Sequence, residues 1–73
     1  MAHPKRYYKI QVKKFLRGWE TESHGEMEQD QAIAKMWEAA KDEEVVMVRC
    51  GYITERLTTN WQGEFYKDGS YIG

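Results

Sequence analysis

The chain has few of the residues that build disulfides and metal sites. Its 73 residues include one cysteine, Cys50, and two histidines, His3 and His24. A single cysteine excludes an internal disulfide framework, and a structural zinc site needs four Cys or His ligands in close pairs. We therefore expect no bound metal, and the sequence indicates no cofactor.

Long apolar runs and a cleavable signal are also missing. The mean hydropathy is -0.85, and no run of about 18 apolar residues predicts a membrane-spanning helix. We expect a soluble protein of a reducing cytoplasm, with no membrane partner.

The patterns typical of enzymes are absent as well. The six glycines are dispersed at turn spacing, so no glycine-rich phosphate loop is predicted. Cys50 shares a β-branched row with Val46 and Val48, where a cysteine behaves as a small hydrophobe, whereas a nucleophile pair would need His24 beside it. The carboxylates lie in charge runs typical of solvated faces. We expect no catalytic residue and no enzyme.

What the chain does have is aromatic residues and charge. Three Trp, five Tyr and two Phe make it 14% aromatic, and 32% of the residues are charged. A chain of this size buries only about 60% of the surface that it exposes when unfolded. We expect one domain over residues 1–73, with a loose N-terminus at residues 1–5 and no room for a large cleft.

The charges are segregated along the chain, although the net charge is only -1. Residues 1–17 hold six basic residues and no acidic one, whereas residues 18–44 hold nine acidic residues against two basic ones. The remainder is balanced. Two segments of opposite charge are therefore available to a partner.

Hydrophobic periodicity predicts two strands followed by a helix. Apolar and polar residues alternate over 8–13, and a return strand is expected over 19–23 after a turn at Gly18. Apolar residues at helical spacing predict a helix over about 28–42, with Asp30 as its N-cap.

Three further strands are expected after the helix. Residues 45–50 form a β-branched run that Gly51 interrupts, and residues 57–65 alternate as one long strand or as two strands broken at Gly63. Asp68 and Gly69 predict a type I′ turn that leads into a short last strand. The expected fold is α+β, in the order ββαβββ, with one helix packed on one face of an antiparallel sheet of four to five strands.

One helix covers only one face of such a sheet. We expect the helix to bury its apolar stripe on the first and third strands; the core residues are Ile33, Met36, Trp37, Ile10, Val12, Val46 and Val48. The opposite face is expected to stay open and to carry some of the aromatic residues.

Binding is the function that explains these features together. Trp, Tyr, Met and Arg are the residue types that anchor protein interfaces, so a protein partner is favoured. A second copy closing the open face in a homodimer is an alternative occupant. Single-stranded nucleic acid is the other alternative, because the basic first strand is interleaved with aromatic rings, although the isoelectric point of about 6.1 opposes it. The lysines also have a simpler interpretation, as residues that keep an edge strand soluble.

Two sets of candidate binding residues follow from these hypotheses. The first is basic and aromatic, and comprises Lys5, Arg6, Tyr7, Lys9, Lys13, Lys14, Arg17, Trp61, Tyr66 and Tyr71. The second is acidic, and comprises Glu20, Glu22, Glu26, Glu28 and Asp30.

The chain resembles the small proteins that bacteriophages encode against host defence, including anti-CRISPR proteins. The features that carry the resemblance are the ββαβββ order, the basic strand at residues 7–14 and the terminal hairpin at residues 65–71. The resemblance is architectural and covers most of the chain. It implies an inhibitor without catalytic residues, which occupies the nucleic-acid or partner site of a host protein in the bacterial cytoplasm.

Overall fold

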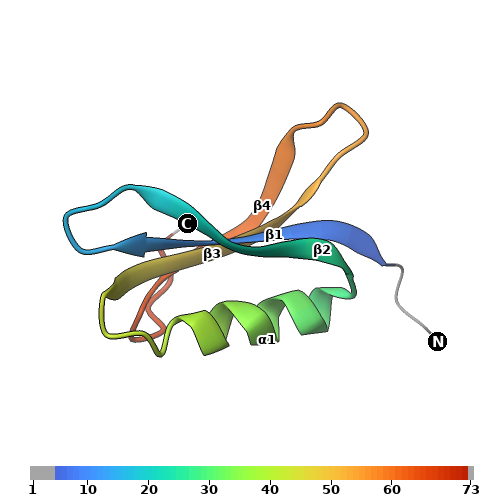
Figure 1. Cartoon of the computed structure of the whole chain (residues 1–73). Coiled ribbons are helices and arrows are strands. Elements are labelled where there is room, and N and C mark those ends of the chain that lie inside the picture. Colours follow the sequence, from blue (N-terminus) through green and yellow to red (C-terminus); the bar gives the residue numbers. More distant parts are fainter. Residues whose placement is uncertain (1–4, 73) are drawn as a thin grey trace.

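A computed structural model of the chain describes residues 5–72. It contains β1 (Arg6–Lys14), β2 (Trp19–Met27), α1 (Gln29–Ala39), β3 (Val45–Ile53) and β4 (Thr59–Tyr66). The strands form one antiparallel sheet in the order β2-β1-β3-β4, and α1 lies across one face of it (Figure 1). The predicted α+β fold is confirmed. Apart from the exposed Lys5, the loose N-terminus expected at residues 1–5 lies outside the described residues.

The last expected strand is reduced to a single bridge that joins Tyr71 to Phe65. The turn before it has a positive φ of 97° at Gly69 alone, so it is not the predicted type I′ turn, which needs positive φ at two residues. Tyr71 still packs edge-on against Phe65, with 5.4 Å between the ring centroids.

The core lies between α1 and the two central strands. The largest fully buried side chains are Ile10, Met36, Val12, Val45 and Val48. Burial of each contributes roughly 1.5–3 kcal/mol relative to an exposed side chain, so this layer supplies most of the apolar stabilisation. Ile33 and Trp37 are only partly buried, at the border of the core.

Each pair of neighbouring strands contains one extra residue. The registers skip Glu22 in β2, Val46 in β3 and Gln62 in β4. Because an extra residue shifts the alternation by one, Val45 takes the buried place that Val46 was expected to hold, and Val46 is half-buried.

The helix begins at Gln29, close to the predicted start at about 28, and it ends at Ala39, sooner than predicted. Its N-cap is Glu28 and not Asp30, and the backbone N–H of Glu28 donates to Oε1 of Gln31 at 3.0 Å, as in a capping box. Asp30 lies in the first turn, where its charge suits the positive end of the helix dipole. Among the described residues no helix has the length and apolar character needed to cross a membrane.

Gly51 was expected to interrupt the strand at residues 45–50, but β3 continues through it to Ile53. The residue instead allows β4 to approach β3 closely. A Cβ at this position would lie 2.5 Å from the carbonyl oxygen of Asn60 and 2.8 Å from Cα of Trp61. Beyond this point the β3–β4 hairpin projects from the sheet on the side away from α1 (Figure 1). The missing side chain therefore permits the pairing from which the hairpin extends.

Gly51→Ala is expected to destabilise the protein by about 1–3 kcal/mol, because the added methyl group meets backbone atoms that cannot rotate away. Urea unfolding followed by far-UV circular dichroism measures the loss. Gly18→Ala is the matched control, since a Cβ there meets nothing within 4 Å, and its effect is expected to stay within about 0.5 kcal/mol. Equal stability of the two variants would contradict the close-approach explanation.

Candidate interaction surface

The face of the sheet opposite α1 is here called the open face, because no element of residues 5–72 forms a layer over it (Figure 1). Strand alternation and the registers place on it side chains from all four strands. They are Tyr7, Lys9, Gln11 and Lys13 of β1, Trp19, Thr21, His24 and Glu26 of β2, Met47, Arg49 and Ile53 of β3, and Thr59, Trp61, Glu64 and Tyr66 of β4.

The centre of the open face is a stack of two indole rings with a guanidinium group between them. The guanidinium carbon of Arg49 lies 4.2 Å from the ring centroid of Trp19 and 4.0 Å from that of Trp61. Both distances are within the range of a cation–π interaction. The two rings come from the edge strands β2 and β4, so the stack spans the whole width of the sheet.

Hydrogen bonds fix the guanidinium group in this place. Nη1 of Arg49 donates to Oε1 of Glu64 at 3.0 Å, and Nε donates to Oε1 of Gln11 at 2.9 Å. Nε2 of Gln11 in turn donates to the hydroxyl of Thr21 at 3.3 Å. The charge of Arg49 is thus neutralised within the protein, and the positions of both rings are set before any partner arrives.

A second aromatic pair lies toward the other end of the open face. The Tyr7 hydroxyl shares a hydrogen bond with Nδ1 of His24, and the two rings stack with 5.7 Å between their centroids. Lys9 pairs with His24 in the register, and Lys13 pairs with Trp19. The open face therefore carries two lysines beside its aromatic groups.

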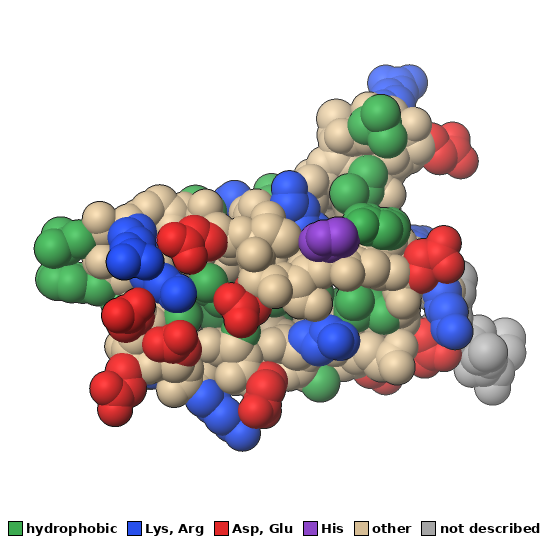
Figure 2. Space-filling model, in the orientation of Figure 1, with side chains coloured by type: hydrophobic (Ala, Val, Ile, Leu, Met, Phe, Trp, Pro, Cys, Tyr) green, Lys and Arg blue, Asp and Glu red, His purple; other side chains and the backbone are tan. Residues whose placement is uncertain are grey.

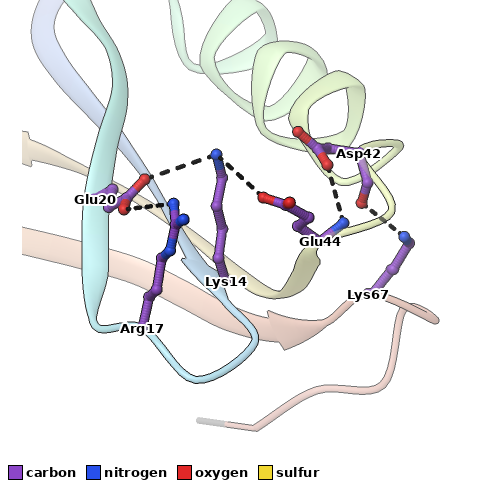
Figure 3. A network of polar contacts seen from close by, with 6 residues as sticks. All are labelled: Lys14, Arg17, Glu20, Asp42, Glu44 and Lys67. Carbon is purple, nitrogen blue, oxygen red and sulfur yellow. Dashed lines mark hydrogen bonds and ion pairs between the residues drawn. The ribbon is translucent and has the colours of Figure 1, made fainter.

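The structure separates the predicted basic and aromatic residues into different groups. Tyr7, Lys9, Lys13, Trp61 and Tyr66 lie on the open face, and Lys5 is exposed beside it in the chain. The others lie elsewhere: Lys14 and Arg17 are in ion pairs at the β1–β2 turn (Figure 3), the guanidinium of Arg6 lies 4.3 Å from the ring centroid of Tyr52, and Tyr71 packs on Phe65.

The predicted acidic residues do not share one environment either. Glu20 pairs with Lys14, with 3.8 Å between Oε2 and Nζ, and Glu22 is the extra residue of β2. Glu26 pairs with Tyr7 in the register, on the open face. Glu28 caps α1, and Asp30 lies in its first turn.

The candidate binding residues predicted from the sequence did not include Arg49, Glu64, Gln11 or Trp19. One signal was available, because Arg49 is the only charged residue in a strand of otherwise apolar residues and glycine. A charge in such a strand needs a partner close by. The pairing with Glu64 depends on the register of β3 against β4, which the extra Gln62 shifts.

Cys50 and His24 lie on opposite faces of the sheet. Cys50 pairs with Ile10, on the side of α1, and is buried, whereas His24 pairs with Lys9 on the open face. Burial raises the pKa of the Cys50 thiol above its ordinary value. The pair therefore has neither the geometry nor the thiolate that nucleophilic catalysis needs.

Two hollows border the sheet. One of about 100 Å³ lies between α1 and β4 beside Cys50, and the other, of about 380 Å³, adjoins Arg6 and Tyr52. Ligand sites usually enclose about 300–1,000 Å³, so the first is too small for one. Within residues 5–72, no three His, Cys, Asp or Glu side chains are grouped as a metal site requires.

Arg49→Lys is expected to lower the free energy of unfolding by about 1–3 kcal/mol, because an ammonium group loses both the stacking and the fork of hydrogen bonds. Urea titration with tryptophan fluorescence reports the stability and the environment of the two rings together. Lys35→Arg, at an exposed position of α1, is the matched control and is expected to change stability by less than about 0.5 kcal/mol. An Arg49→Lys protein as stable as the control would exclude a structural role of the stack.

Cys50 is expected to react with Ellman's reagent at least about 100-fold more slowly in the folded protein than in urea, because the thiol is buried and protonated.

The raised pKa of the Cys50 thiol in the folded protein also makes the stability depend on pH. The thiol ionises at a lower pH in the unfolded chain than in the folded protein. The contribution of Cys50 to the stability is therefore fully present below the ordinary thiol pKa of 9.0, and it is lost as the pH rises through the higher folded value. Urea unfolding between pH 7 and 10.5 tests the sign, and Cys50→Ala is expected to flatten the curve.

No model of a protein family, no curated protein and no solved structure matches the chain. The open face is therefore interpreted from its own residues, and the likeness to phage inhibitors stays a prediction.

Proposed function

We propose that this protein is a non-enzymatic binding module that covers a surface of a partner protein, with the open face as its main contact. The observation that carries the proposal is the stack of Trp19, Arg49 and Trp61 at the centre of that face. Trp, Tyr and Arg are the residue types that dominate the energetics of protein interfaces.

The stack suits binding because it is fixed in advance. Arg49 is held by Gln11 and Glu64, so neither the guanidinium nor the rings that lie against it need to be ordered when a partner docks. Ordering a flexible side chain at an interface costs roughly 0.5–1.5 kcal/mol, and that cost is reduced here. Tyr66 lies on the same face, and its exposure of 49% leaves much of the ring free for contact.

The charges of the open face favour a protein over nucleic acid. Of the basic residues near the N-terminus, Lys14 and Arg17 are ion-paired with acidic side chains. Lys9 and Lys13 remain on the open face, where the carboxylate of Glu26 also lies, whereas the charges of Arg49 and Glu64 neutralise each other. A phosphate backbone requires several basic contacts that acidic neighbours do not offset.

The architectural likeness to phage-encoded inhibitors suggests the class of partner. We infer that the target is a host defence protein or another protein that handles nucleic acid, in the cytoplasm of a bacterium. A one-to-one complex that covers the surface of the target would block the target without any chemical reaction. Such inhibition needs only the binding face described here.

Capture experiments with bacterial lysate test the proposal. The double variant Tyr66→Ala with Lys13→Ala removes an exposed ring and a half-buried lysine of the open face, both outside the core, and is expected to weaken capture of a specific protein at least about tenfold. Lys35→Ala, on the exposed surface of α1, is the control and is expected to capture as the wild type does. Quantitative mass spectrometry of the bound fractions gives the ratio.

The salt dependence of capture distinguishes a protein partner from single-stranded nucleic acid. Capture through an aromatic protein interface is expected to change less than about threefold between 50 and 200 mM salt, whereas binding through six or more phosphate contacts falls about a thousandfold or more. Recovery of nucleic acid alone, with that steep salt dependence, would replace the proposal with single-strand binding. Equal capture by the double variant and the control would remove the open face from the interface.

A further inference from the structure

The turn between β1 and β2 ends in an exposed apolar tip, formed by Phe15 and Leu16. Phe15 is 69% exposed and Leu16 is 90% exposed. In Figure 2 apolar side chains protrude at the end of this hairpin, at the left of the molecule, and both basic and acidic side chains lie beside them. Single exposed leucines are common, but two adjacent apolar residues at a protruding tip are available to a partner.

Leu16 also adopts a backbone conformation that opposes its own side chain. Its φ is +62°, in the left-handed region that glycine and asparagine tolerate and that bulky residues rarely adopt. Its side chain is almost fully exposed, so little burial offsets this strain within the molecule. Leu57 has the same φ, so strain and exposure alone do not mark a contact; the exposed Phe15 next to Leu16 is what distinguishes this turn.

The tip is held rigidly to the rest of the fold. The backbone N–H of Phe15 donates to the carbonyl of Glu44 at 2.9 Å, which ties the turn to the loop before β3. Lys14 bridges Glu20 and Glu44, and Arg17 reaches Glu20 (Figure 3). Exposed ion pairs contribute little energy individually, but together with the backbone bond they fix the direction of the tip.

The charges around the tip identify the kind of partner. Lys14 and Arg17 are paired with carboxylates, and the loop beside the tip adds the exposed acids Asp42 and Glu43. One lysine, Lys67, lies against this loop, and its Nζ donates to the backbone carbonyl of Asp42 at 2.7 Å (Figure 3). An apolar tip that enters a membrane needs a surplus of basic residues near anionic lipid headgroups. The acidic surroundings oppose such a surface and favour a socket with a basic rim.

We propose that Phe15 and Leu16 insert into an apolar socket of the partner protein, and that Lys or Arg residues on the rim of the socket face Asp42 and Glu43. This proposal rests on the proposed function and adds the chemistry of the partner to it. The tip adjoins the open face, because Lys13 and Trp19 pair at the base of the turn. One partner therefore covers both surfaces.

Leu16→Asn tests the tip, because asparagine tolerates the left-handed conformation that strains leucine. The variant is expected to unfold at a temperature equal to that of the wild type or a few degrees higher, and to capture the lysate partner at least about tenfold less well. Leu57→Asn is the matched control. Leu57 lies in the β3–β4 turn with the same φ of +62° and is 86% exposed, and its replacement is expected to relieve the same strain without loss of capture.

A photo-crosslinking residue in place of Phe15 identifies the socket. Benzoylphenylalanine at this position is expected to crosslink a peptide of the captured protein that is apolar and flanked by Lys or Arg. A flanking sequence rich in Asp or Glu would overturn the proposed rim, and binding of the wild type, but not of Leu16→Asn, to phosphatidylglycerol vesicles would show that the tip meets lipid instead.

The failures of the two proposals are distinguishable. If Leu16→Asn captures the same protein as the wild type, while the open-face double variant does not, the socket is wrong and the binding function stands. If the wild type captures no protein at all, both fail.

Discussion

One eleven-residue helix lies on a four-stranded sheet, and this imbalance is the constraint on which the rest of the structure depends. The helix buries the apolar side of β1 and β3, where Ile10, Val12 and Val48 have no exposed surface. Among residues 5–72 no helix or further strand covers the other side of the same strands, so side chains of the sheet itself shield it.

The stack of Trp19, Arg49 and Trp61 meets this constraint. Two large rings and a planar cation cover the central strands from above, and the cation keeps its hydrogen bonds through Gln11 and Glu64. A purely apolar group of this size would expose an aggregation-prone hydrophobic patch on a small protein, whereas a stack with polar partners is compatible with water. The same composition is the one that protein interfaces prefer, so shielding and binding need not compete here.

The sequence predicted the class of fold and the order of its main elements, because periodicity survives local irregularity. It could not predict the faces of the strands in detail. The extra residues Glu22, Val46 and Gln62 each shift the alternation by one, and each is defined by the register against a partner strand and not by its own segment. The exchange of Val46 for Val45 in the core, and the meeting of Arg49 with Glu64, both follow from these shifts. The separation of Lys13 from Lys14 needs no such shift, because neighbouring residues of one strand point to opposite faces of the sheet.

The two hairpin turns lie outside the core, so residues there can contact a partner without contributing to the stability of the fold. Leu16 and Leu57 lie at opposite ends of the sheet, each with a φ of +62° and almost no burial, so neither is explained by the fold. Only the first has a second apolar residue beside it and a backbone bond that ties it to the neighbouring loop. A strained residue is retained in a functional role only where the surrounding structure fixes it. The anchoring by Glu44 and Lys14 therefore favours the β1–β2 turn as the contact and leaves the core free of any binding role.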